Sequence, residues 1–416
     1  MRSNFAVLAV VSALTFAQTP SPWEEPLARK QWDQAEPILK AALAETETAP
    51  VLRGLATVYR ATGRMDAAEP ILERLVALDG SVANLEDLAR IKAGLGRLDR
   101  AEALYRSSLA LRLEAGTDPL ASIPVRGRLA QILVAERKFP EAEQEALSAI
   151  SLRTRLAGEN HPDLAGDHAQ LARIFQVQKK WQDAANTWET VVAIQANSFG
   201  YEDLRIADTL DNLATCRLAT GVAGASFDQA ENALRRALAI REANLGLSNA
   251  DVAATTDQLG KVLYSAKRFS DAEPYFRRTL SIYIKLMGAD NPALAPYFDD
   301  VAVTEAMLEK YVESETFYRE ALKLRDTDDA LNLRNLARVL IAQNKNAEAQ
   351  PLYSRALAVM DAGSASNSDL LPVILTEYSD LLRDLKRPVD AAKLDQRLRS
   401  GKQAPQGKQP PVAAKQ

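Results

Sequence analysis

The sequence predicts an all-α solenoid built from repeated helix–turn–helix units. Along most of its 416 residues one small residue returns at intervals of 33 to 46 positions. Its members are Ala35, Ala68, Ala101, Ala142, Ala184, Ala230, Ala272, Ser314, Ala349 and Ala391. A period of this length is typical of stacked supersecondary repeats. Because one such unit cannot bury its apolar side alone, we expect neighbouring units to share a continuous core.

A second recurring feature lies twelve residues before most of these small residues. It is a large apolar residue followed by a small one, as in Leu55-Ala56, Leu88-Ala89, Leu129-Ala130, Leu171-Ala172, Leu259-Gly260, Val301-Ala302 and Leu336-Ala337. One unit is an exception, because its Leu213-Ala214 pair is displaced by an insert near residues 222–225. Apolar residues around these pairs recur three and four positions apart, which is the helical period. We therefore expect two helices per unit, crossing closely where the small residues meet.

The repeated positions resemble those of the tetratricopeptide repeat. Residues 52–78, LRGLATVYRATGRMDAAEPILERLVAL, carry its Leu-Ala, Tyr, Gly-Arg and Ala-Glu positions in order. The longer units resemble the kinesin light chain variety, as in LAGENHPDLAGDHAQLARIF (156–175), TLDNLATCRLATG (209–221) and LMGADNPALAPYFDDVAV (286–303). The resemblance covers residues 32–399. It implies a right-handed superhelix of about nine complete helix pairs, with the first helix of each pair lining a concave groove.

The two ends of the chain differ in composition from the repeats. Met1-Arg2, an apolar run over residues 5–16 and Ala17 before Gln18 predict a secretory signal peptide over residues 1–17. The run is shorter than the roughly 20 residues that span a bilayer; an uncleaved anchor or an ordinary apolar start are the alternatives. Residues 18–399 are assigned to the solenoid. Residues 400–416, rich in Pro, Gln and Lys, are predicted to be a disordered tail.

Composition and the rarer residues argue against several functional classes. The net charge of −4 comes from interspersed residues without a basic stripe, so no nucleic-acid face is expected. The single cysteine, Cys216, falls on a repeat position held elsewhere by valine or isoleucine, which predicts a buried side chain. His161 lies in an Asn-His-Pro loop and His168 at a position otherwise apolar. We therefore expect no catalytic residues, no cofactor and no metal site.

The candidate binding residues are polar positions on the first helices. In the kinesin light chain variety the asparagine of Asn-Leu-Ala binds ligand backbone, and the resemblance places Gln170, Asn212, Gln258 and Asn335 there. Amides both donate and accept, which suits an extended peptide. Three residues further along lie the basic residues Arg90, Arg173, Lys261 and Arg338. They are predicted to form a ladder that pairs with carboxylates, or, alternatively, ordinary ion pairs on helix surfaces.

These features predict a non-enzymatic protein–protein interaction scaffold outside the cytoplasm, periplasmic or secreted. It would hold an extended, acidic segment of a protein partner in the groove, with no nucleic acid and no stable membrane insertion after signal cleavage. The alternative is a structural subunit of a cell-envelope assembly or export complex that docks through its convex face or its ends. A small-ligand binder or enzyme would need a compact pocket with convergent polar groups.

Overall fold

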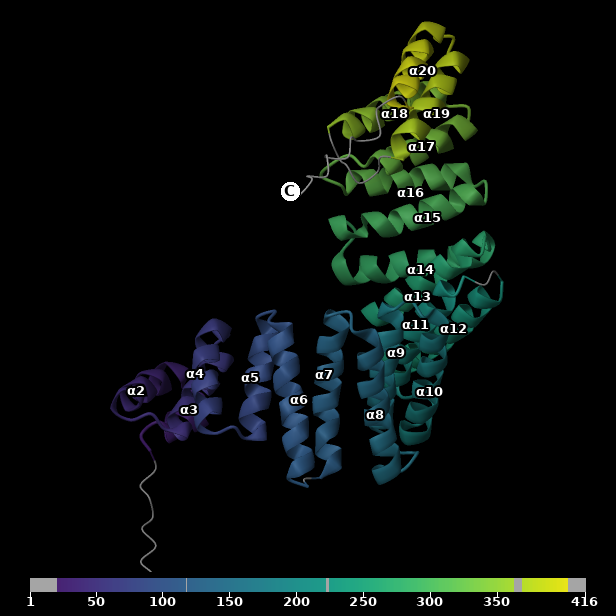
Figure 1. Cartoon of the computed structure of the whole chain (residues 1–416). Helices are drawn as coiled ribbons and strands as arrows, with labels where there is room; N and C mark the ends of the chain where they lie inside the picture. The colour runs from purple at the N-terminus through teal and green to yellow at the C-terminus, as the bar shows by residue number, and fades with distance from the viewer. Residues whose placement is uncertain (1–20, 117, 222–223, 363–368, 403–416) are drawn as a thin grey trace, which may run out of the picture. The chain divides into compact units, whose positions relative to one another are not determined.

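The computed structural model describes residues 21–116, 118–221, 224–362 and 369–402, and every regular element among them is a helix. The chain is divided into two compact units, and the boundary along the sequence falls between Lys179 and Lys180. Nine first helices and ten second helices alternate along the described residues, in agreement with the predicted number of pairs. In Figure 1 the helices of each unit lie side by side in chain order. The all-α repeat fold predicted from the sequence is confirmed.

Unit 1 contains the repeats before Lys180. Its first helices are α3 (Ala49–Ala61), α5 (Val82–Gly94), α7 (Ile123–Ala135) and α9 (Leu164–Val177). Its second helices are α2 (Trp32–Glu45), α4 (Met65–Leu78), α6 (Leu98–Glu114) and α8 (Phe139–Ala157). A short helix, α1 (Glu24–Ala28), precedes them, and a 3-10 turn, η1 (Pro119–Ser122), leads into α7.

Unit 2 contains the remaining helices. Its first helices are α11 (Leu204–Ala219), α13 (Ala250–Ser265), α15 (Ala295–Met307), α17 (Ala330–Ala342) and α19 (Leu370–Asp384). Its second helices are α10 (Trp181–Phe199), α12 (Ala225–Leu245), α14 (Phe269–Met287), α16 (Tyr311–Lys323), α18 (Asn346–Asp361) and α20 (Pro388–Lys402). The 3-10 turn η2 (Pro292–Leu294) leads into α15.

The recurring small residues lie buried where helices cross. Nine of the ten are fully buried and Ala391 is nearly so. Ser314, the one exception to alanine, donates its hydroxyl to the carbonyl of Ala302, 2.7 Å away, so its polar atom is satisfied inside the core. At Gly260 an added Cβ would lie 2.7 Å from the ring of Phe276. The small residues are therefore required by the close approach of the helices.

The turn between the two helices of each repeat contains a residue with a left-handed backbone conformation. Gly63 and Gly96 take this conformation in the two plain repeats, at φ 74° and 73°. In later repeats the residue is charged or amide-bearing: Arg137, Lys179, Lys267, Glu309, Asn344 and Lys386, all near φ 60°. Each such residue costs backbone energy that glycine avoids. The turn is therefore set by the packing of the helices and not by a strict glycine.

The predicted domain limits are tested only in part by the described residues. The predicted signal peptide, residues 1–17, lies outside them, as do residues 403–416 of the predicted tail. Helix α20 ends at Lys402 and so continues beyond the predicted end of the solenoid at 399. Among the described residues, no helix combines the length and the apolar character needed to cross a membrane.

Candidate functional site: two hollows between first helices

Unit 2 carries two small hollows of the same construction, each between one first helix and the next. The first, here the α11–α13 hollow, has a volume of about 200 Å³. Its lining comprises Ala214, Thr215 and Leu218 of α11, Leu234 of α12, and Gln258, Lys261, Val262 and Ser265 of α13. Both polar residues that the sequence predicted on α13, Gln258 and Lys261, therefore face one site.

The second, here the α15–α17 hollow, also has a volume of about 200 Å³. Its lining comprises Val303, Ala306 and Met307 of α15, Tyr311 and Tyr318 of α16, and Asn335, Arg338, Val339 and Ala342 of α17. Asn335 and Arg338 occupy the same repeat positions as Gln258 and Lys261. The structure thus brings an amide and a cation together twice, over an apolar floor from the preceding repeat.

The sequence analysis missed the floor of each hollow. Thr215 and Val303 hold the position at which the neighbouring repeats carry Lys261 and Arg338. At this repeat position, uncharged and cationic residues therefore alternate from one repeat to the next. Each hollow contains one residue of each kind. The alternation is visible in the sequence, but an uncharged residue at this position does not by itself indicate a binding site.

Both cations are close to acidic side chains of the protein. The Nζ atom of Lys261 lies 2.6 Å from Asp257 Oδ2 and 3.9 Å from Asp300 Oδ2. Burial acts to lower the pKa of Lys261, but these two carboxylates outweigh it and the net pKa is raised. Arg338 is 58% exposed, and its Nε atom lies 3.8 Å from Glu377 Oε1. Arg338 is therefore only loosely held and Lys261 is firmly charged.

The lining of the α15–α17 hollow includes the Asn335 amide and the Tyr318 phenol. Tyr318 is buried in α16, and burial raises the pKa of its phenol, so the group stays neutral. Arg338 lies one helical turn beyond Asn335 on the same face. The equivalent Gln258 is exposed at the rim of its hollow.

Two predicted amides are used within the protein instead. Gln170 donates Nε2–H to the carbonyl of Gly127 at 2.5 Å, across to the preceding first helix of unit 1. Gly127 has no side chain, and a Cβ there would lie 2.9 Å from Gln170 Oε1. Asn212 donates Nδ2–H to the carbonyl of Asp208, 2.9 Å away in its own helix. Neither amide lines either hollow.

The two predicted cations of unit 1 lie apart from both hollows. Arg90 is exposed and pairs with Asp87, which also accepts a 2.7 Å hydrogen bond from Arg60. Arg90 therefore fits the alternative of an ordinary helix-surface ion pair. Arg173 lies exposed on α9. Of the four predicted amides and four predicted cations, Gln258, Lys261, Asn335 and Arg338 line the two hollows of unit 2.

The rarer residues occupy the places that the repeat positions predict. Cys216 is fully buried. His168 is half-buried, and burial lowers the pKa of its imidazole. His161 accepts a hydrogen bond from the backbone N–H of Asp163 in the loop before α9, at 3.3 Å. Within the described ranges, no three His, Cys, Asp or Glu side chains are grouped so that they could hold a metal ion.

Family models of the tetratricopeptide repeat match residues 27–89, 125–163, 224–285 and 251–327. No curated protein sequence matches the chain. Among solved structures, BtubC (BKLC) of P. vanneervenii is 24% identical over 61% of this chain and 91% of its own, with a TM-score of 0.43. Kinesin light chain TPR-like repeats of Podosopora anserina are 20% identical over 50% and 99%, with a TM-score of 0.43.

A third solved structure is the C-terminal part of a TPR repeat-containing protein from Cytophaga hutchinsonii, 12% identical over 76% of this chain and 98% of that one, with a TM-score of 0.45. The matched stretches lie in both units and coincide with the repeat positions described above. Proteins of this repeat class bind protein partners on their extended surfaces and are generally not enzymes. Residues 27–89, 125–163 and 224–327 of the chain are therefore tetratricopeptide repeats.

Proposed function

We propose that this protein is a non-enzymatic scaffold outside the cytoplasm that holds an extended, acidic segment of a protein partner along its first helices. The observation that carries the proposal is the repeated pairing of an amide and a cation over an apolar floor, Gln258 with Lys261 and Asn335 with Arg338. The amide binds the backbone of the segment, the hollow takes one apolar side chain, and the cation pairs with a carboxylate.

The size of the hollows favours a peptide over a small molecule. At about 200 Å³ each lies below the roughly 300–1,000 Å³ typical of small-molecule sites. Two such hollows in one unit instead suit successive side chains of one chain segment. The charge of Lys261 is retained at neutral pH because its pKa is raised, and it keeps N–H donors beyond the one that Asp257 accepts.

The test is affinity capture from extract of the native organism with wild-type protein and the double variant Lys261→Ala/Arg338→Ala. We expect the variant to lose at least tenfold of the bound partner, since each charge-assisted hydrogen bond contributes about 1.5–3 kcal/mol. The control is Lys285→Ala/Lys323→Ala, which removes two exposed cations from the second helices α14 and α16. Equal recovery of the partner by the wild-type protein and by Lys261→Ala/Arg338→Ala would contradict the proposal.

Export is tested separately from binding. We expect N-terminal sequencing of the protein purified from its native source to begin at Gln18, because cleavage is proposed after Ala17. The same cells fractionated into cytoplasm and exported material give the distribution of the protein. A mature chain that begins at Met1 and remains with the cytoplasmic fraction would contradict the proposed location.

A further inference from the structure

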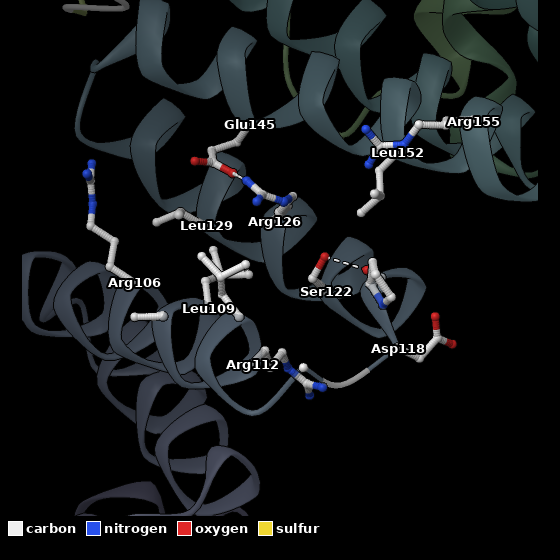
Figure 2. Close-up of a pocket in the computed structure, with 14 residues that line it drawn as sticks. Arg106, Leu109, Arg112, Asp118, Ser122, Arg126, Leu129, Glu145, Leu152 and Arg155 are labelled. Atoms are coloured by element: carbon white, nitrogen blue, oxygen red, sulfur yellow. Dashed lines mark hydrogen bonds and ion pairs between the residues drawn. The ribbon is translucent and has the colours of Figure 1, made fainter.

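Unit 1 contains a larger cavity on the side of its second helices. Its volume is about 720 Å³, and it lies between α6 and α8, with η1 and the first half of α7 as its floor. Figure 2 shows side chains from these elements around one opening. It shares no residue with the two hollows of unit 2. Its volume falls within the range of roughly 300–1,000 Å³ that accommodates a ligand larger than one side chain.

The cavity results from a mismatch in helix length. Helix α6 has 17 residues and α8 has 19, whereas α7 between them has 13. At 1.5 Å per residue the second helices are about 6–9 Å longer than the first helix that they flank. In unit 1 the plain second helices α2 and α4 have 14 residues each and leave no such overhang. The cavity thus lies where the long repeats begin.

One residue explains why the space between the long helices of this repeat is not filled by a side chain. Seven positions before the large–small pair, the other long repeats carry the buried aliphatic residues Leu164, Ile206, Val252 and Leu294. Here that position is Ser122, which lines the cavity and donates its hydroxyl to the carbonyl of Pro119 at 2.6 Å. Ile123 is buried next to it but does not line the cavity. Among the long repeats compared, only this one therefore lacks a large apolar side chain at that position.

The walls combine aliphatic side chains with guanidinium groups. Leu109, Leu113, Leu129 and Leu152 supply apolar surface, and Leu113 is 83% exposed at the rim. Covering an exposed leucine of this kind removes apolar surface from water and is favourable. The cavity therefore favours an occupant with aliphatic groups.

The guanidinium groups are not equally available. Arg106 pairs with Glu102 and Glu141, Arg112 with Glu86, and Arg126 with Glu145 at 2.5 Å. The Nε–H of Arg126 is nevertheless buried without an acceptor. Arg155 is exposed on α8 and, within the described part of the chain, has no ion pair. A carboxylate of the occupant would find its partner at Arg155, on the rim beside Leu152 in Figure 2.

We propose that this cavity docks a segment of a protein partner in which two aliphatic side chains are followed by carboxylates. Asp118 and Ser122 on the opposite wall offer acceptor oxygens, which the backbone N–H groups of a peptide satisfy. A free fatty acid lacks such donors and would leave these oxygens without a partner from the occupant. The partner is therefore a peptide, held on the second-helix side of unit 1 and independent of the hollows of unit 2.

The test measures fluorescence anisotropy of capped, fluorescein-labelled peptides with the full mature chain. The probe is Gly-Leu-Leu-Glu-Glu-Gly, with Gly-Leu-Leu-Lys-Lys-Gly and Gly-Ser-Ser-Glu-Glu-Gly as matched peptides. We expect each matched peptide to bind at least tenfold more weakly, since each lacks one of the two chemistries. Ser122→Leu, which restores the residue type of the other long repeats, should abolish binding by filling the cavity.

Two surface variants keep the test decisive if Ser122→Leu disturbs folding. Arg155→Glu and Leu113→Asp change exposed side chains, and each should weaken binding about tenfold. Arg100→Glu makes the same charge change at an exposed site on α6 outside the cavity, and should bind as wild type does. Lys261→Ala/Arg338→Ala should also bind this peptide normally, which separates the present proposal from the function proposed for unit 2.

Three results would overturn the proposal. The first is equal binding of the glutamate and lysine peptides by the wild-type protein. The second is unchanged affinity in both Arg155→Glu and Leu113→Asp. The third is displacement of the apolar dye 8-anilinonaphthalene-1-sulfonate by sodium laurate, with no displacement by the unlabelled glutamate peptide, which would assign the cavity to a free amphiphile.

Discussion

At the scale of single residues, four glycines end the long second helices in a backbone conformation that side chains disfavour. Gly158, Gly200, Gly246 and Gly288 follow α8, α10, α12 and α14 with φ of 79–95° and ψ of 152–168°. This region of positive φ and extended ψ is populated almost only by glycine. An added Cβ would meet no atom within 4 Å at any of the four, so the requirement comes from the backbone alone. The glycine that follows each of these long helices is thus explained by torsion and not by packing.

We expect Gly288→Ala to lower the free energy of unfolding by about 1–3 kcal/mol, the cost of a non-glycine residue in this region. The measurement is urea denaturation followed by circular dichroism. Gly94→Ala is the control, because Gly94 ends α5 at negative φ with open space around it. That change should stabilise the protein by about 0.5–1 kcal/mol. Equal effects of the two substitutions would contradict the torsional explanation.

A second residue-scale prediction concerns Asp300 on α15. It holds the position at which α13 and α17 carry Gln258 and Asn335, and burial raises its pKa to about 6. Lys261 opposes this shift, while Asp257 and Asp299 add to it. Because the folded protein holds this proton more tightly than the unfolded chain, whose carboxyl has a pKa of 3.8, ionisation of Asp300 costs stability as the pH rises from about 4 to about 6.

We therefore expect Asp300→Asn to change the pH profile of stability. The variant should gain about 1–3 kcal/mol relative to wild type between pH 4 and pH 7, with the gain complete above pH 6. Urea denaturation at pH 4, 5, 6 and 7 measures this difference. Asp390→Asn on α20 is the control, since ion pairs with Lys393 and Arg387 lower the pKa of Asp390, so its contribution to stability changes only below about pH 4 and the variant should run parallel to wild type from pH 5 to pH 7. Parallel profiles for wild type and Asp300→Asn would rule the explanation out.

At the scale of the helices, stability depends on close crossings between neighbouring first and second helices. Leu259-Gly260 on α13 faces Phe276 on α14, and Gly54 on α3 faces Leu39 on α2. In both places a Cβ would approach the facing side chain to 2.7 Å. The small residue and the large residue opposite it therefore form one packing unit.

We expect Gly260→Ala to cost about 1–3 kcal/mol, because its Cβ would overpack the ring of Phe276. Combining it with Phe276→Leu should recover part of this loss, giving a coupling energy of about 0.5–3 kcal/mol in a double-mutant cycle. Gly166→Ala on α9 is the matched control, since no atom lies within 4 Å of its added Cβ. Strict additivity of the two changes would show that the crossing does not limit the residue size.

At the scale of the whole molecule, each unit has its own series of cores in which a repeat contacts mainly its neighbours. In unit 2 the core beneath α17–α20 includes Tyr353 of α18, fully buried and stacked on Tyr378 of α19 with ring centroids 5.6 Å apart. Unit 1 has separate cores around Leu55 and around Leu129. In such an array stability is approximately the sum of repeat and nearest-neighbour terms.

We therefore expect a chain that ends at Asp361, without α19 and α20, to lose stability in unit 2 only. Exposure of Tyr353 and the loss of its partners should cost about 3–5 kcal/mol and lower the melting temperature of that unit by about 6–20 °C. Hydrogen exchange in α3 to α8 should be unchanged, as measured by mass spectrometry. A chain that ends at Lys402 is the control. Faster exchange throughout unit 1 would show that the two units unfold together.

The sequence by itself determined the helices, the number of repeats, the buried ladder from Ala35 to Ala391 and the burial of Cys216. These follow from periodicity, which records the local steric needs of each helix pair. Only the tertiary structure decided which polar residues form a site. Gln170 is bonded to a carbonyl 43 residues away, and Arg338 lies beside Glu377 in the next repeat, so their partners depend on how repeats stack. The same holds for Ser122, since the absence of a large side chain at this position leaves a cavity only when the long helices on both sides are in place.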